Sequence, residues 1–403
     1  MSIIKQKLEL LRSQMQQHKI DFYLVPSIDA HNSEYVPECW QRRTWISGFT
    51  GSAGEVLVAT DKAYLWTDGR YFLQAEQELN SELYVLMRQN GFIPHTEKWL
   101  EENAVGKVLG IDPRVIGVNR AKKLQEIMNS INGSVEFINT NLIDESRILS
   151  GETLSLPISQ AFHLEEKYSG EAIEDKLAWL RSELIRLKVD YIALNVLDEI
   201  AWLFNLRAFD IAYNPLLISY AIIGTTDACL YVDKSKLNLP IINILTQHGV
   251  LIDSYDSFYN KLSELKGRIA LDAKTANFSM YKNIASTNEI KFETSPIVYG
   301  KACKNNTEIN GSRQAHIKDA VVLSNFFYWL HSNWRSGVDE LKCADKLLEY
   351  RKQAENWIGL SFQTISGFAA NGAVIHYHPS EDTNKTIDDT SLYLLDSGSQ
   401  YLE

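Results

Sequence analysis

The sequence predicts an α/β protein of two similar domains, followed by a third unit that is expected to be incomplete. Up to about residue 300, short apolar runs rich in β-branched and aromatic residues alternate with helical stretches, as in α/β sheet domains. The same order of landmarks occurs twice along this part of the chain, which indicates a duplication. After about residue 302, long helical patterns replace the alternation.

The first domain is expected over residues 1–150. Its N-terminal segment places Ile4, Leu8, Leu11 and Met15 at helical spacing. The predicted strands and helices that follow are strands at 21–26, 55–59 and 63–66 and helices at 71–79 and 119–131. Turn-forming residues at 150–152 and Pro157 interrupt the periodicity and are expected to end the domain.

The second domain is expected over residues 151–300. A helix at 170–187 leads into the apolar run 189–194, just as the first helix leads into 20–25. Two further landmarks recur in order: 202–206 corresponds to 45–49, and 228–233 corresponds to 63–68. Any two α/β domains share helix-then-strand order, but three landmarks in matched order favour two copies of one fold.

The third unit is expected over residues 301–403. It contains two predicted helices, at 307–330 and 339–356, and three short strand-like runs, at 362–366, 373–377 and 391–396. Two helices and three strands cannot easily bury one another as a finished domain, so we expect this unit to be incomplete.

The composition excludes several classes of function. A formal net charge of −11 and a pI of about 5.4 disfavour binding to nucleic acid or to anionic membranes. There is no run of 18 apolar residues, and the first 17 residues are too polar for a signal peptide. Since the four cysteines are far apart, neither a disulfide scaffold nor a zinc ribbon is indicated, and a cytoplasmic protein is expected.

Two segments near the C-terminus carry candidate functional residues. Alternation along the predicted strand 373–377 would put His376 and His378 on one face, where they could bind a metal or polarise a carbonyl. Most histidines near strand ends are only solvated or hydrogen-bonded. Asp396 follows an apolar run and could bind a hard cation, although an ordinary Asp-Ser-Gly turn is equally consistent with the pattern.

Two further segments lie in the first domain. The glycines of residues 48–54 have the wrong spacing for a dinucleotide loop, and the strand at 55–59 replaces the helix that would hold a pyrophosphate, so nucleotide binding is rejected. Arg70 follows a strand and a turn. By itself it fits a surface or ion-paired residue better than a substrate contact.

Together these segments resemble one family over nearly the whole chain. The matching segments are Pro26-Ser27, residues 29–35, Arg42-Arg43, residues 47–54, residues 66–72, residues 372–377 and residues 395–401. They are similar to cytosolic-type aminopeptidase P, the Xaa-Pro aminopeptidases. The resemblance implies two creatinase-type N-terminal α/β domains followed by the start of a pita-bread α+β catalytic domain.

The resemblance also implies a chemistry. Members of this family remove the N-terminal residue from peptides with proline in second position, using two Mn²⁺ ions whose bridging hydroxide attacks the scissile carbonyl. Asp396 corresponds to the first metal-binding aspartate, His376 to a histidine that hydrogen-bonds the substrate, and Arg70 to a substrate-contacting arginine. A homodimer is expected for the full-length form.

The chain also departs from the family pattern. The family's second aspartate, its metal-binding histidine and its two glutamates would fall beyond Glu403, so this chain alone is expected to bind metal weakly and to be inactive. A prolidase or creatinase is an alternative, which the duplication and the segment around Arg70 argue against. The other alternative is a non-catalytic binding module of the same fold, which would tend to lose residues such as His376 and Asp396.

Overall fold

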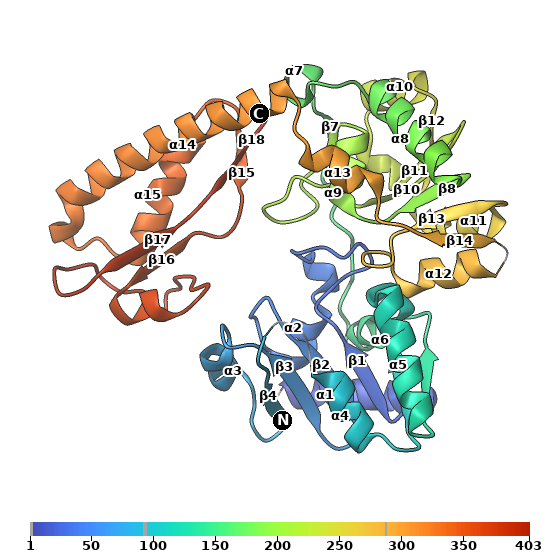
Figure 1. Ribbon diagram of the computed structural model, residues 1–403. Coiled ribbons are helices and arrows are strands. Elements are labelled where there is room, and N and C mark those ends of the chain that lie inside the picture. Colours follow the sequence, from blue (N-terminus) through green and yellow to red (C-terminus); the bar gives the residue numbers. More distant parts are fainter. Residues whose placement is uncertain (1–2, 92–94, 287) are drawn as a thin grey trace.

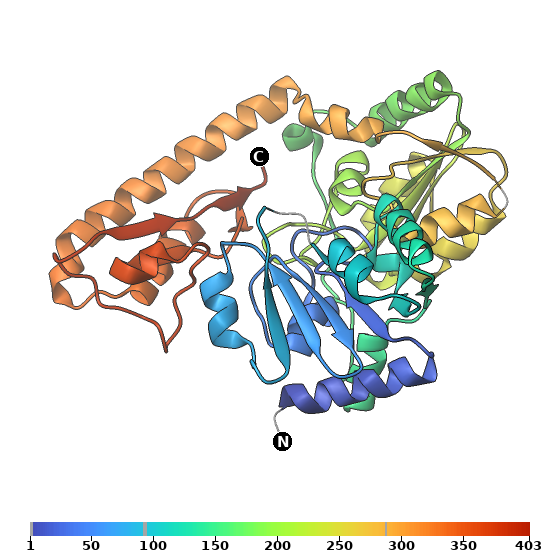
Figure 2. The same ribbon diagram turned by 60° about the horizontal axis from the view of Figure 1, so that its bottom comes forward.

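The computed structural model describes residues 3–91, 95–286 and 288–403, so residues 1 and 2 of the N-terminal segment lie outside it. The chain forms three units in sequence order. Two of them are built on six-stranded sheets, and the third extends away from them along one long helix (Figure 1). The view in Figure 2 shows the same arrangement, with the third unit beside the first.

The first sheet has the strand order β4-β3-β2-β1-β5-β6. Its strands are β1 Phe22–Val25, β2 Glu55–Ala59, β3 Ala63–Thr67, β4 Tyr84–Arg88, β5 Val108–Ile111 and β6 Ser134–Phe137. The helices of this unit are α1 Ile3–Gln17, α2 Arg42–Ser47, α3 Phe72–Glu78, α4 Thr96–Asn103, α5 Val118–Ser130 and α6 Leu142–Leu149. Strand β2 is buried along its whole length, so this sheet carries packing on both faces.

The second sheet repeats the first, with the strand order β12-β11-β10-β8-β13-β14. Its strands are β8 Tyr191–Leu194, β10 Ser219–Gly224, β11 Ala228–Val232, β12 Val250–Ser254, β13 Arg268–Leu271 and β14 Glu289–Phe292. The helices are α7 Glu166–Ser169, α8 Ile173–Leu187, α9 Leu197–Leu203, α10 Leu239–Gln247, α11 Phe258–Glu264, α12 Phe278–Ala285 and α13 Pro296–Ala302, and a small hairpin pairs β7 Phe162–His163 with β9 Leu206–Arg207.

The two sheets agree in strand direction as well as in order. In each, the first three strands along the chain pair antiparallel and the other three join in parallel. A shared order with shared directions is the same topology, so the predicted duplication is confirmed. The predicted strand at 55–59 is β2, which supports the rejection of a dinucleotide loop.

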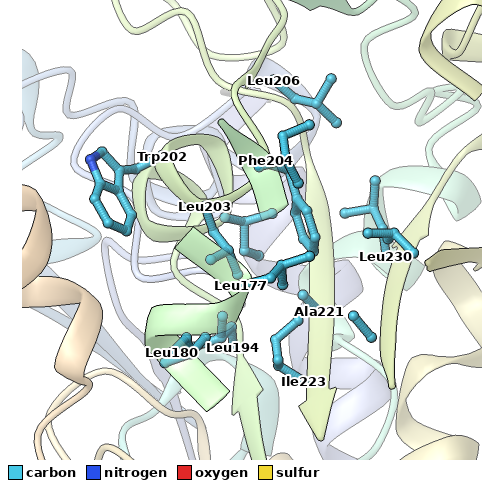
Figure 3. Close-up of a cluster of buried hydrophobic side chains, with 14 of the residues drawn as sticks. Leu177, Leu180, Leu194, Trp202, Leu203, Phe204, Leu206, Ala221, Ile223 and Leu230 are labelled. Carbon is cyan, nitrogen blue, oxygen red and sulfur yellow. The ribbon is translucent and has the colours of Figure 1, made fainter. Parts of the chain in front are cut away.

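Each sheet is stabilised by apolar side chains from the helices that cover it. In the second unit, Leu177 and Leu180 of α8 pack with Ala221 and Ile223 of β10 (Figure 3). Every residue of β10 is buried, which a strand covered on both faces requires. At about 25 cal/mol per Å² of apolar surface removed from water, such clusters are the main stabilising term of these units.

The first and second units meet at a buried polar contact. The ring of His31 lies between them, with Nδ1 2.8 Å from the carbonyl oxygen of Asn195 and Nε2 2.8 Å from the hydroxyl of Tyr255. The carbonyl can only accept, so Nδ1 carries the proton and Nε2 accepts from the tyrosine. Burial lowers the pKa of His31 from its usual value, which favours this neutral form.

The third unit begins with the 28-residue helix α14 Asn306–Asn333. Asn305 caps it in a capping box, accepting from the backbone of Glu308 at 2.9 Å while the Glu308 carboxylate accepts from the backbone of Asn305 at 2.9 Å. The other elements are α15 Glu340–Lys352, β15 Trp357–Leu360, β16 Ile365–Phe368, β17 Tyr393–Asp396 and β18 Ser399–Tyr401. The two predicted helices are therefore confirmed, with shifted ends.

Much of the apolar surface of α14 faces solvent. Val322 and Phe326 are its buried residues, whereas Ile317, Val321 and Tyr328 are 58%, 57% and 77% exposed. In both views α14 runs along the outer edge of the third unit (Figure 1 and Figure 2). Among the described residues, no helix is long and apolar enough to cross a bilayer.

One predicted strand is wrong. Residues 369–373 form a 3-10 helix and the chain then turns, so the predicted strand at 373–377 does not exist. His376 has a φ of +59°, a left-handed conformation that no strand residue adopts. His376 and His378 therefore do not share a strand face. The neighbouring strand, predicted at 362–366, is displaced and begins at Ile365.

Candidate active site between the first and third units

A tyrosine of the first unit contacts the candidate histidine of the third. The hydroxyl of Tyr71 lies 2.6 Å from Nδ1 of His376 and 2.6 Å from Oγ of Ser52. Tyr71 is only 2% exposed and immediately precedes helix α3. The His376 side chain, by contrast, lies at the surface. The described bonds leave its Nε2 without a partner, so this nitrogen is available to a ligand.

The glycine-containing segment 48–54 packs against Tyr71. A Cβ at Gly51 would lie 2.3 Å from the Phe49 ring and 2.7 Å from Cδ1 of Tyr71, so only glycine fits there. The rings of Phe49 and Tyr71 meet edge to face at 6.1 Å. This segment, which resembles a phosphate loop only superficially, forms one wall of the space that holds the tyrosine.

The buried side chain of Arg43 is hydrogen-bonded to the same segment, residues 48–54. Its guanidinium donates to the carbonyl oxygen of Gly51 and, at 2.8 Å, to Oγ of Ser27, and it lies 5.1 Å from the Phe49 ring centre. Arg43 is buried, and this burial lowers its pKa from the usual value to about 10. A buried cation bonded to backbone fixes the loop because its donors have no access to water.

Arg70 forms a bidentate ion pair with Asp68. Its Nε and Nη2 donate to the two carboxylate oxygens, each at 2.8 Å. Hydrogen bonds from Arg70 are the main reason that the pKa of Asp68 lies below its usual value. The guanidinium also lies 5.2 Å from the ring centre of Tyr71. Arg70 and His376 thus both contact Tyr71.

The loop that carries His376 is anchored by a buried carboxylate on α15. Glu340 is completely buried and accepts from the Tyr377 hydroxyl at 2.8 Å, from the backbone of Phe368 at 2.5 Å and from the Asn371 side chain at 3.0 Å. Every polar group of this cluster has a partner, as a buried network requires. Because Tyr377 is held in this way, its neighbour His376 turns towards the first unit.

Asp396 lies apart from these residues. It is the last residue of β17, pairs in register with Ile365 of β16 and is exposed. Within the described ranges, no hydrogen bond or ion pair joins Asp396 to His376 or Arg70, and no cluster of three or more His, Cys, Asp or Glu side chains is suited to a metal. One exposed carboxylate does not make a two-metal site, so the described residues do not fit such a centre.

Sequence reasoning missed Tyr71 and Glu340. Tyr71 stands directly after Arg70 in the recognised segment, so the motif contained it, but its role depends on a partner far along the chain. Glu340 begins a helix and resembles an ordinary acidic residue of a first turn. Only its complete burial reveals its role.

Three family matches cover nearly the whole chain. Residues 7–149 and residues 153–308 each match the Creatinase/Prolidase N-terminal domain. Residues 310–403 match Metallopeptidase family M24. These descriptions agree with the duplicated sheets and with the helix-rich third unit.

Individual relatives point the same way. The probable Xaa-Pro aminopeptidase P of Podospora anserina is 41% identical over 98% of this chain and 60% of its own length. That of Pyricularia oryzae is 40% identical over 98% of this chain and 67% of its own length. This chain spans 60–62% of the length of the Podospora anserina protein and of two further fungal relatives, which are therefore longer than it.

A solved structure shares the fold. The X-prolyl aminopeptidase of Caenorhabditis elegans, described as a cytosolic enzyme with a di-nuclear active site, superposes with a TM-score of 0.92 at 30% identity. The match covers 99% of this chain and 68% of that enzyme. The relative arrangement of the three units is therefore one that a crystal structure also contains.

Proposed function

Since the chain belongs to the Xaa-Pro aminopeptidase P family of M24 metallopeptidases, we propose that its protein removes the N-terminal residue from peptides with proline in second position. The observation that carries the proposal is the meeting of Arg70 and His376 at Tyr71. Residues of the first and third units come together there, and the exposed side chain of His376 lies where a peptide could reach it.

We assign His376 and Arg70 distinct roles. The surface nitrogen of His376 can donate to the carbonyl of the scissile peptide and stabilise the charge that develops on its oxygen. Arg70 offers planar donors to peptide carbonyls or carboxylates. Its bidentate pair with Asp68 fixes the plane of the guanidinium, which reduces the entropy lost when a peptide binds.

The described residues do not by themselves support metal chemistry. Asp396 is the one carboxylate that we assign as a ligand, and a pair of ions, Mn²⁺ by family resemblance, requires several more. The fungal relatives that the chain matches are longer than it, since it spans 60% and 62% of their length. We therefore propose that the 403-residue chain alone binds Mn²⁺ weakly and does not hydrolyse Xaa-Pro peptides.

Three further properties are proposed on the same basis. The cytosolic nematode relative and the separated cysteines support a cytoplasmic location. Family resemblance suggests a homodimer for the full-length form. The domain limits are proposed at residues 1–150, 151–300 and 301–403, on the pattern of turns and helices along the chain.

The proposed activity is tested by peptide release. The protein as its gene encodes it should release the first residue from an Xaa-Pro-Xaa peptide and should leave the matched Xaa-Ala-Xaa peptide intact. The 403-residue chain is assayed beside it and is expected to be inactive. Binding of the Xaa-Pro peptide without cleavage by the complete protein would refute the enzyme and favour the binding module.

A further inference from the structure

We propose that Tyr71 is a positioning residue for His376: its hydroxyl donates to Nδ1 and thereby keeps the ring proton on Nε2. This inference deepens the proposed function and rests on it, because an N–H on Nε2 is what a donor to the substrate carbonyl requires. Tyr71 itself contacts His376 and Ser52 and is not expected to touch the reacting atoms.

Counting protons shows which group donates in each of the two hydrogen bonds. The Tyr71 hydroxyl has one proton and two neighbours, each at 2.6 Å. If Ser52 donates to the tyrosine oxygen, the tyrosine proton goes to Nδ1 of His376, and a neutral imidazole then carries its proton on Nε2. This arrangement is favoured because an sp² ring nitrogen is a stronger acceptor than a hydroxyl oxygen, so the single proton of the buried tyrosine is donated to His376.

The side chain of Tyr71 and the backbone of His376 are both held in place, so the bond can enforce one tautomer. Tyr71 is buried against Phe49 and Gly51, which leave its ring no room to rotate away. His376 is kept in a left-handed backbone conformation beside the anchored Tyr377. A non-glycine residue persists there only where its surroundings determine the conformation, and such residues cluster at functional sites.

The contact also joins two units. Tyr71 stands at the start of helix α3 in the first unit, whereas His376 lies in a loop of the third unit. Any displacement of one unit against the other would break a 2.6 Å bond and release the imidazole. The tautomer of His376 therefore depends on how the first unit packs against the third. This dependence explains why a histidine that donates to substrate would need an N-terminal domain.

The test is a nitrogen NMR measurement on the 403-residue chain labelled with ¹⁵N-histidine. Two-bond proton–nitrogen correlations distinguish the tautomers, and the variant His376→Gln assigns the ring. We expect His376 of the unmodified chain to show the Nε2–H form. Tyr71→Phe, which removes only the hydroxyl, should yield a mixture of tautomers, and Ser52→Ala a smaller change in the same direction.

A matched control isolates the hydroxyl. Tyr64 is a partly buried tyrosine of the same unit, packed beside Trp66 and Trp99, and Tyr64→Phe should leave the His376 signals unchanged. The signals of the buried His31 report in every variant that the fold is intact. The inference would be overturned by an Nδ1–H tautomer of His376 in the unmodified chain. It would also be overturned if Tyr71→Phe left the His376 signals unchanged while the His31 signals stayed native.

Kinetics of the complete protein separate the two proposals. Tyr71→Phe should lower kcat about tenfold, the usual effect of one neutral hydrogen bond, with little change in KM. If the unmodified protein has no turnover but His376 still responds to Tyr71→Phe, the proposed function fails and the positioning role stands. If turnover is normal and Tyr71→Phe changes neither kcat nor the ring signals, the positioning role alone fails.

Discussion

The hydroxyl of Tyr71 lies 2.6 Å from Nδ1 of His376, although 305 residues separate the two in the chain. The bond spans the first and third units, and Arg70, which directly precedes Tyr71 in the chain, lies beside the same ring. A peptide that reaches His376 therefore also meets the first unit. The N-terminal repeat thus contributes to the candidate site as well as to stability.

Arg70 and His376 should both be required by the complete protein. We expect Arg70→Ala to lower kcat/KM about 10- to 100-fold, because charged hydrogen bonds contribute about 1.5–3 kcal/mol. His376→Ala should lower kcat about 100-fold or more, the usual cost of losing one oxyanion donor. Steady-state release from an Xaa-Pro peptide measures both. Substitution of two exposed residues, Arg88→Ala and His316→Ala, provides controls, and parental kinetics in the Arg70 or His376 variant would contradict the assigned roles.

Glu340 should stabilise the loop that carries His376. Glu340→Ala removes the acceptor for the backbone amides of Phe368 and Lys385, whereas Tyr377 keeps Thr383 as a second acceptor. Leaving a buried backbone donor unpaired costs about 1–3 kcal/mol. We expect the free energy of local opening at β16 and β17 to fall by about 3 kcal/mol or more, measured by hydrogen exchange.

The exposed Glu349 on the same helix is the control for Glu340. It pairs with Lys346 at 2.8 Å at the surface, and such pairs contribute about 0.5 kcal/mol. Equal exchange rates at β16 in Glu340→Ala and Glu349→Ala would show that the buried carboxylate does not anchor the loop.

Glu199 should make stability depend on pH. Burial raises its pKa from the usual 4.5 to about 7, so the folded state retains a proton that the unfolded state has lost. The stabilising effect of this proton is complete below pH 4.5 and is lost as pH rises through about 7. Relative to Glu199→Gln, the unmodified chain should lose about 2–3 kcal/mol of unfolding free energy between about pH 5 and about pH 8.

Denaturant unfolding at several pH values measures this difference. The exposed Glu101 supplies the control, and Glu101→Gln should follow the unmodified chain at every pH. A difference between Glu199→Gln and the unmodified chain that stays constant over this whole range would mean that Glu199 does not titrate there.

The 403-residue chain should bind Mn²⁺ weakly. One exposed carboxylate at Asp396 competes poorly with water for a hard cation. Calorimetric titration should give no heat that saturates at micromolar metal, and Asp396→Asn should not alter the trace. Micromolar affinity would reveal ligands other than those named here, and its loss in Asp396→Asn would show that Asp396 is one of them.

Limited proteolysis should cleave first at the two proposed junctions. Residues 152–161 contain no regular structure, and Ile158 is 80% exposed, while Cys303 and Lys304 are exposed between α13 and α14. We expect fragments that end near residues 150–160 and near residue 303, identified by mass spectrometry. Early cleavage within a six-stranded sheet, with both junctions intact, would contradict the proposed limits.

The sequence by itself determined the architecture. Alternating apolar runs located β2 and β3, the repeated landmarks revealed the duplication, and helical spacing located α14. These features depend on burial patterns within about 20 residues, which a chain displays locally. The family resemblance followed from the same local segments, because motifs such as residues 66–72 are contiguous.

Only the tertiary structure decided the surroundings of His376. Local alternation predicted a strand at 373–377, but the buried carboxylate of Glu340 holds Tyr377 and the chain turns through a left-handed residue instead. The contact with Tyr71 likewise depends on how the first and third units pack. Hydrogen bonds between residues so far apart leave no periodicity in the sequence, and their energy outweighs the weak local preference of a short apolar run.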